Sequence, residues 1–264
     1  MVDKLTFKEA LRVIENLLEG KKASQVSTLN AEFVLAAQDD KDFRKAIKEA
    51  TLVLADGIGI LWAAKFLSLK HKNTFTYFLS LSGILLRPKW VRGVLPDKVS
   101  GSDLFWPLLE LASRKGKKVF LLGAASGVAE QVEKIAVKNF PDLQIVGTYA
   151  GSPRAQEEAS IVDKINSSGA DLILVAYNFL EQEKWIHRNL KKLKTIKVAI
   201  GLGGTFDFVV GAKALGKGFR ARRAPLTLRK LGLEWLWRLL TQPYRWRRIW
   251  NAVFRFSWRV YKKK

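Results

Sequence analysis

Residues 171–177 read Asp-Leu-Ile-Leu-Val-Ala-Tyr, and no polar residue interrupts the apolar run at their centre. A strand that is apolar on both faces is typical of a parallel sheet covered by helices on both sides. Residues 181–193 have the apolar spacing of a helix, and the next apolar run, 197–202, predicts another strand. This stretch therefore predicts a strand–helix–strand unit.

The same alternation extends towards the N-terminus. Further strands are predicted at 25–28, 51–55, 117–122 and 143–148, and helices at 31–50, 102–116, 127–139 and 154–168. Regular alternation predicts an α/β fold with a Rossmann-like, mostly parallel sheet and helices on both faces. Ligands of such sheets bind at the carboxyl ends of the strands, so the residues there are the candidates for chemistry.

Composition excludes several classes of site. The chain has 264 residues and no cysteine, which rules out disulfides, thiolate metal sites and cysteine nucleophiles and makes a cytoplasmic location the default. Residues 1–20 predict an amphipathic helix rather than a signal peptide. Residues 75–86 are the longest apolar stretch but are too short to span a bilayer, and we expect a core segment or a loop that dips into lipid.

Positive charge is concentrated at the C-terminal end. The net charge is +22, and residues 212–264 carry 16 Lys/Arg against one acid, Glu234, a net +15, with five of the nine tryptophans. Basic charge with tryptophan indicates an anionic partner that also accepts apolar side chains, either membrane headgroups or nucleic acid. The sequence thus predicts an α/β domain over 1–211 and a basic, tryptophan-rich helical appendage over 212–264.

Within the appendage, glycines 211, 216 and 218 predict a loop, 225–240 a helix, and Pro243 a break before a last helix. One face of this last helix is apolar and contains Trp246, Ile249, Trp250, Val253, Ser257 and Tyr261. The opposite face contains Arg248, Asn251, Arg255, Arg259 and Lys262. This pattern predicts a helix in the membrane interface, and it favours lipid over nucleic acid because phosphate binding does not require the apolar face.

Asp56 is the candidate general base. It follows the strand 51–55, and Gly57 allows the backbone to turn sharply, so the carboxylate would point into the crevice at the strand ends. Partial burial would raise its pKa towards the value that a base needs. The alternative is an Asp that caps the next helix or closes the turn.

Further candidates lie in loops that follow other strands. Thr28 and Asn30 can bind sugar hydroxyls or an acetamido group, or can cap the helix that begins at residue 31. Gly123 and Gly127 flank a loop before a helix, which suits a diphosphate but equally a tight turn. Gln182 could hold a base or a sugar hydroxyl, or lie exposed at a helix start.

Three arginines of the appendage, Arg238, Arg245 and Arg248, could clamp a diphosphate, or could form a general headgroup-binding face. Asp207, in the loop after strand 197–202, faces the site or caps a turn. The chain has no HExxH, Walker or DxD motif, so we predict no protein-held metal and no cofactor.

Eight stretches in a fixed order carry a family resemblance: TLNAEFVLAA, LADGIGI, SGSDLF, VFLLGAASGVAE, QEKWI, GLGGTFDFVVG, RRAP and LGLEWLWRLLTQPYRWRR. From about Ser27 to Arg248 the chain resembles the WecG/TagA/CpsF family of bacterial glycosyltransferases. The resemblance implies inverting, metal-independent transfer of N-acetylmannosamine, or its uronic acid, from a UDP-sugar to undecaprenyl-diphosphate-linked GlcNAc. The products feed teichoic acid or other cell-surface polysaccharide synthesis.

The resemblance also implies roles for single residues. Asp56 corresponds to the proposed base, Thr28 and Asn30 to pocket residues, and Gln182 to the glutamine of the family's QE motif. Arg238, Arg245 and Arg248 correspond to the diphosphate-binding arginines. The implied location is peripheral, on the cytoplasmic face of the cell membrane. The sequence does not decide whether the chain forms a homo-oligomer.

The chain departs from the family where the family reads G-x-P-K-Q-E, because residues 178–183 are Asn-Phe-Leu-Glu-Gln-Glu. The lost lysine and the gained Glu181 could alter how the donor is held. A non-catalytic, nucleotide-sugar-binding paralogue is therefore kept as an alternative. The basic C-terminal segment keeps a second one, with less support: a nucleic-acid-binding α/β protein.

Overall fold

The computed structural model describes residues 2–211, 224–230 and 232–263. These residues contain a six-stranded sheet in the order β2-β1-β6-β5-β3-β4, in which all neighbouring strands are parallel. The strands are β1 (Ser24–Leu29), β2 (Leu52–Ala55), β3 (Lys118–Gly123), β4 (Gln144–Tyr149), β5 (Leu172–Ala176) and β6 (Val198–Gly201). Each lies within one residue of its predicted bounds, which confirms the predicted α/β fold.

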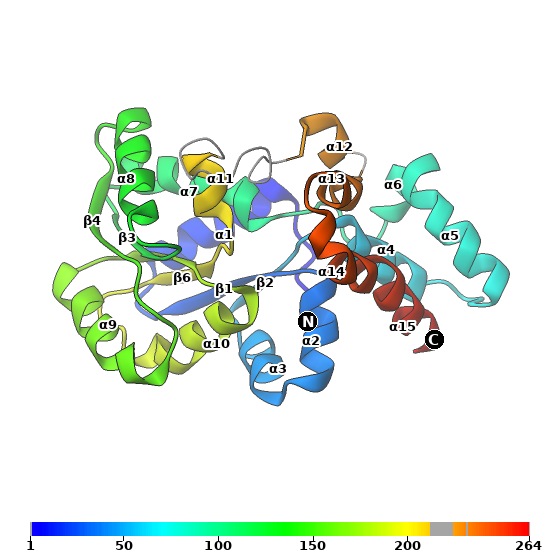
Figure 1. Ribbon diagram of the computed structural model, residues 1–264, viewed down its shortest axis with the longest axis horizontal. Coiled ribbons are helices and arrows are strands. Elements are labelled where there is room, and N and C mark those ends of the chain that lie inside the picture. The colour runs from blue at the N-terminus through cyan, green and yellow to red at the C-terminus, as the bar shows by residue number, and fades with distance from the viewer. Residues whose placement is uncertain (1, 212–223, 231, 264) are drawn as a thin grey trace.

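Helices cover both faces of the sheet (Figure 1). One face packs against α1 (Phe7–Glu19), α7 (Gly101–Arg114) and α8 (Val128–Asn139). The other packs against α2 (Ala31–Asp39), α3 (Lys41–Lys48), α9 (Ala155–Ser168) and α10 (Phe179–Asn189), which a 3-10 turn (Leu190–Lys192) extends. Along β5, Leu174 enters the first core and Val175 the second, which is why this strand is apolar throughout.

The helical character predicted for 31–50 is confirmed, and the stretch is divided into two helices, α2 and α3. Asp40 ends α2 and caps α3, where its Oδ1 accepts a hydrogen bond from the N–H of Phe43 at 2.8 Å. An N-cap Asp has a non-helical backbone, and its side chain accepts a hydrogen bond from a backbone N–H two or three residues ahead. One helix therefore ends at Asp40 and the next begins after it.

The stretch 75–86 is a helix and not a loop, and only one side of it packs into a core. It forms α5 (Thr74–Leu86), which buries Tyr77, Ser80 and Gly83 and exposes a row of large apolar side chains. The buried side packs against α4 (Ile58–Leu67), α6 (Pro88–Val91) and the C-terminal helix α15 (Phe256–Lys262). None of the described helices is both long and apolar enough to cross a bilayer.

The C-terminal segment is helical but more divided than predicted. It contains α12 (Leu226–Lys230), α13 (Glu234–Thr241), a 3-10 turn (Pro243–Arg245), α14 (Trp246–Trp250), a π-helical turn, η4 (Asn251–Arg255), and α15. The predicted helix over 225–240 is interrupted at Gly232, whose φ of 74° is left-handed. The predicted loop glycines 216 and 218 lie outside the described residues, next to the predicted boundary at 211/212.

The predicted apolar face of the last helix is only partly the buried one. Ile249, Phe256 and Val260 are buried, whereas Trp246 and Trp250 are each 55% exposed. Helical spacing identifies apolar rows but cannot decide which of two rows packs against the protein, and the π-helical turn further changes the angle between α14 and α15. The buried row rests on α2 and α4, beside the end of the sheet (Figure 1).

Candidate active site

Asp56 stands at the carboxyl end of β2, directly beside the end of β1. The backbone N–H of Asp56 donates to the carbonyl of Leu29 at 2.8 Å, and Gly57 turns the chain with a φ of 100°. Gly57, not Asp56, takes the N-cap position of α4, so the helix-capping alternative for Asp56 is wrong. The half-buried carboxyl group of Asp56 instead lines a cavity.

This cavity, which we call the catalytic cavity, has a volume of about 230 Å³. It lies between the ends of β1 and β2, helix α4 and the C-terminal helices. Five residues predicted for the site line it: Asn30, Asp56, Arg238, Arg245 and Arg248. Residues more than 180 positions apart thus meet at the edge of the sheet where an α/β fold binds its ligands.

The surroundings of Asp56 favour its neutral form. The pKa of Asp56 is raised to about 7, mainly by burial and also by the negative charge of Glu234, while Lys98 and Arg238 act in the opposite direction. A carboxyl group that titrates near neutrality can take up a proton during catalysis and release it afterwards. Asp56 therefore has the electrostatic character of a general base.

Asn30 serves the fold and the cavity at once. Its Oδ1 accepts a hydrogen bond from the N–H of Phe33 at 3.1 Å, so the predicted N-cap of α2 is confirmed. The cap uses the carbonyl end of the side chain, and the amide nitrogen is the end that can donate to a ligand.

Arg248 is held at the wall of the catalytic cavity by two contacts. Its guanidinium donates two hydrogen bonds of 2.8 Å to Glu32, and this pairing raises the pKa of Arg248. It also lies 5.6 Å from the ring centre of Phe179, on the first turn of α10. Glu32 engages two of the five N–H donors of the Arg248 guanidinium.

Two ion pairs fasten the C-terminal helices to the α/β domain near Asp56. Lys98 pairs with Glu234 at 3.3 Å, and Arg229 of α12 pairs with Asp103 of α7 at 3.0 Å. Lys98 and Glu234 also line the catalytic cavity. Neither pair was predicted, because partners this far apart in sequence leave no local pattern. The one available signal was that Glu234 is the single acid among sixteen bases.

Thr28 and Gln182 are not among the described residues that line the catalytic cavity. Thr28 is buried within β1, in register with Leu54. Gln182 is also buried; its Oε1 accepts from the N–H of Gly203 at 2.9 Å and its Nε2 donates to Glu183 at 3.2 Å. Gln182 is therefore not exposed at a helix start, and it fixes the loop that follows β6.

Gly123 and Gly127 form a turn between β3 and α8, four strand positions away from β2. At a strand spacing of about 4.8 Å, this turn lies roughly 19 Å from Asp56 along the sheet edge. Both glycines have left-handed φ, 100° and 79°, and a Cβ at Gly123 would overlap the backbone of Ala176. The geometry therefore explains both glycines as turn residues, and their role in diphosphate binding stays a prediction.

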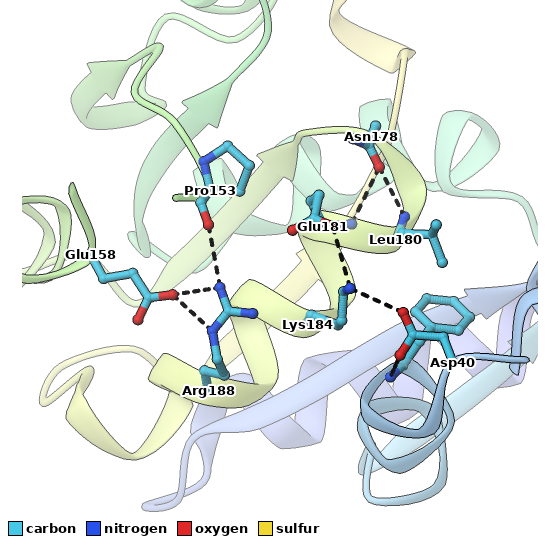
Figure 2. A network of polar contacts seen from close by, with 9 residues as sticks. Asp40, Pro153, Glu158, Asn178, Leu180, Glu181, Lys184 and Arg188 are labelled. Carbon is cyan, nitrogen blue, oxygen red and sulfur yellow. Dashed lines mark hydrogen bonds and ion pairs between the residues drawn. The ribbon is translucent and has the colours of Figure 1, made fainter. Parts of the chain in front are cut away.

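The residues that replace the family's Gly-x-Pro-Lys serve the local structure. Asn178 caps α10, where its Oδ1 accepts from the N–H groups of Leu180 and Glu181. Lys184 bridges Glu181 and Asp40, which ties α10 to α3 (Figure 2). The turn therefore survives these replacements.

Asp207 and a second surface depression are weaker candidates for the functional site. Asp207 lies in the short helix α11 (Thr205–Val210) and not among the residues of the catalytic cavity. A second, open depression lies between β4 and α9 and is lined by Val146, Asp163 and Lys164, among others. It does not lie at the carboxyl ends of the strands, so we place the site at the catalytic cavity.

Comparison with known proteins supports the family resemblance. A family model described as "Glycosyl transferase WecG/TagA/CpsF family" matches residues 1–82 and 82–264. An "N-acetylglucosaminyldiphosphoundecaprenol N-acetyl-beta-D-mannosaminyltransferase" of Bacillus spizizenii is 33% identical over 233 residues, which cover 88% of this chain and 77% of the relative. A protein of Bacillus subtilis with the same name is 28% identical over 235 residues, which cover 89% and 78%.

Proposed function

Because the chain belongs to the WecG/TagA/CpsF family of glycosyl transferases, we propose that it transfers N-acetylmannosamine, or its uronic acid, from a UDP donor to undecaprenyl-diphosphate-linked GlcNAc. The names of the two Bacillus relatives support the sugar and the lipid-linked acceptor. The product would feed teichoic acid or another cell-surface polysaccharide. The observation that carries the proposal is one cavity that joins a carboxyl of raised pKa to three arginines.

The reaction is a single displacement. The carboxylate of Asp56 removes the proton from the acceptor hydroxyl, and the acceptor oxygen attacks the anomeric carbon of the donor. The bond between that carbon and the UDP oxygen breaks on the opposite face, so the configuration inverts, and UDP leaves with the bonding electrons. The proton stays on Asp56 until solvent takes it up.

Arginines of the appendage offset the charge of the diphosphates. Arg238, Arg245 and Arg248 all line the catalytic cavity with Asp56, and Arg248 can offer the N–H groups that Glu32 does not engage. Guanidinium groups aimed at the leaving diphosphate stabilise the charge that develops in the transition state without a metal ion. Asn30 contributes its amide group as a donor to the sugar.

The appendage, 212–264, serves as a membrane-docking unit that completes the site. Its net charge of +15 favours an anionic leaflet, and the lipid acceptor requires the enzyme to work at the membrane surface. We therefore propose a peripheral enzyme on the cytoplasmic face of the membrane.

The proposed function is tested by measuring sugar transfer to a lipid-linked acceptor. The purified full chain is incubated with a panel of UDP-sugars and a short-chain polyprenyl-diphosphate-GlcNAc, and products are identified by mass spectrometry. We expect an adduct with the mass of one N-acetylhexosamine or its uronic acid. Donor binding with no transfer to any lipid acceptor would instead support the non-catalytic paralogue. DNA binding that survives moderate salt, without affinity for anionic vesicles, would support the nucleic-acid alternative.

A further inference from the structure

Helix α5 exposes an apolar face that the rest of the described chain does not cover. Phe75 is 74% exposed and Leu86 is 77% exposed, and three further large side chains between them are also exposed: Phe78, Leu79 and Leu85. Positions 75, 78, 79, 85 and 86 follow helical spacing, so they form a single apolar stripe along the helix, with the polar Ser82 at its middle. An apolar stripe of this length on the surface indicates a binding partner.

A second exposed row runs along the C-terminal helices. It contains Trp246, Trp250, Phe254 and Trp258, at intervals of four residues and exposed by 46–55%. The two rows belong to adjoining elements. The hydroxyl of Tyr77 on α5 lies 3.0 Å from Ser257 on α15, and Thr74 lies 3.0 Å from the hydroxyl of Tyr261. Helices α5 and α15 therefore pack against each other and share one apolar cluster (Figure 1).

The charge around both rows identifies the partner. No Asp or Glu occurs between Asp56 and Asp97, whereas this segment contains six bases: Lys65, Lys70, Lys72, Arg87, Lys89 and Arg92. The C-terminal row is likewise flanked by exposed bases, among them Arg247, Arg255 and Lys262. Two like-charged copies of such a surface would repel each other, whereas an anionic bilayer accepts both the bases and the aromatic rings.

The catalytic cavity points to the same surface. Its lining includes Leu81 and Ile84 of α5 and Ala252 and Val253 of the η4 turn. Apolar side chains of both elements thus line the same cavity as Asp56 and the arginines. An isoprenoid chain bound with its diphosphate near the arginines would run past these side chains towards the bilayer.

We propose that α5 is a second membrane-contact element, whose exposed face enters the interfacial region of an anionic bilayer beside the C-terminal tryptophan row. The two elements contribute apolar lining to the catalytic cavity and bring it to the lipid. This inference rests on the proposed membrane location, but it does not depend on which sugar is transferred.

The absence of cysteine allows a direct test on the full chain. Leu79→Cys and Leu86→Cys are each labelled with an environment-sensitive fluorophore, and Val137→Cys on α8, at the other end of the molecule, is the matched control (Figure 1). Vesicles contain phosphatidylcholine with phosphatidylglycerol, with or without doxyl-labelled lipid. We expect a blue shift and doxyl quenching at positions 79 and 86 and neither at 137.

Several results would overturn the proposal. Vesicle-bound protein with unquenched labels at 79 and 86 would mean that α5 faces away from the bilayer. A blue shift that grows with protein concentration before vesicles are added would mean that a second copy covers the stripe. Lack of vesicle binding would also overturn the membrane contact of α5. If the same preparation still transferred sugar to a soluble short-chain acceptor, the proposed function would stand. Quenched labels without any transfer would support the membrane contact of α5 and count against the proposed function.

A second variant measures how much α5 contributes. Phe75→Ser combined with Phe78→Ser should weaken binding to anionic vesicles by roughly tenfold or more, because two large apolar side chains no longer enter the interface. Both side chains are mostly exposed, so the melting temperature should not fall. Unchanged vesicle affinity in the folded variant would contradict the role of α5.

Discussion

At the residue scale, the chemistry depends on where Asp56 sits. Its carboxyl group is neither a helix cap nor fully exposed, and burial beside Glu234 raises its pKa to about 7. Asp56→Asn should lower kcat by about 10²–10⁴-fold, because the amide cannot accept the acceptor's proton. The measurement is turnover with a short-chain acceptor, with UDP-sugar affinity and melting temperature as controls. Turnover close to wild type would remove Asp56 from the mechanism.

The pKa of Asp56 predicts the pH dependence of transfer. The base must be ionised, so kcat/KM should rise with pH and level off above about pH 7. Glu234→Gln removes a negative charge that raises the pKa of Asp56 and releases Lys98, which lowers it. The rise of kcat/KM with pH should therefore occur at lower pH in this variant than in the wild type.

A matched control separates this effect from a general change in charge. Glu110 is an exposed acid on α7, and Glu110→Gln should leave the pH profile of kcat/KM in place. An identical rising limb in Glu234→Gln and wild type would show that Glu234 does not act on the base.

Local sequence was enough to predict part of the site but not all of it. Asn30 and Asp56 follow neighbouring strands whose ends are in register, so their proximity follows from the order of the elements. The Glu32–Arg248 pair joins residues 216 positions apart, and nothing in the local sequence indicates it. The arginines were found through the family resemblance, because periodicity alone left them as a general headgroup-binding face.

At the element scale, apolar runs predicted β2, β3, β5 and β6, because strands buried on both faces are mostly apolar. Strand β1 is an exception, since four of its six buried residues are polar: Ser24, Gln25, Ser27 and Thr28. Helix boundaries were less predictable. Asp40 divides 31–50 and Gly232 divides 225–240, and each break depends on one residue whose backbone or side chain ends a helix. Helix α5 was not recognised, since a row of apolar side chains facing solvent has the same pattern as one facing a core.

A buried carboxyl group at the junction of α10 and the sheet predicts how stability varies with pH. Glu183 is fully buried, and burial raises its pKa to about 7 although Gln25 and Gln182 donate to it. Below about pH 4.5 the carboxyl group of Glu183 is protonated in both the folded and the unfolded chain, so its ionisation does not lower the free energy of unfolding. As pH rises to about 7, Glu183 ionises more readily in the unfolded chain, and the free energy of unfolding falls by an amount on the order of 3 kcal/mol. The melting temperature should therefore fall between about pH 5 and pH 8.

Glu183→Gln should flatten this dependence. The new amide can donate to Oε1 of Gln25, which has no hydrogen-bond partner among the described residues, so the buried network stays satisfied. Thermal unfolding of the variant and wild type across this pH range is the measurement, with Glu130→Gln on the surface of α8 as the control. Parallel curves for all three proteins would mean that Glu183 does not titrate in this range.

At the scale of the whole molecule, the uneven charge and the position of the catalytic cavity have one explanation. The appendage supplies the arginines of the site and most of the excess positive charge, and its buried row anchors it to α2 and α4. In the proposed function the appendage both meets the membrane and binds the diphosphate, so docking and substrate capture would occur at the same surface.

Charge reversal separates docking from catalysis on this surface. Arg247, Arg255 and Lys262 are exposed and do not line the catalytic cavity. At ~1 kcal/mol per base near an anionic surface, changing all three to Glu should weaken binding to phosphatidylglycerol-containing vesicles by roughly 100-fold or more. Transfer to a soluble short-chain acceptor should change little. Reversal of Lys134, Lys138 and Lys191, exposed bases on α8 and just beyond α10, is the matched control and should leave vesicle binding intact. Equal losses in both triple variants would mean that total charge, rather than this surface, holds the protein at the membrane.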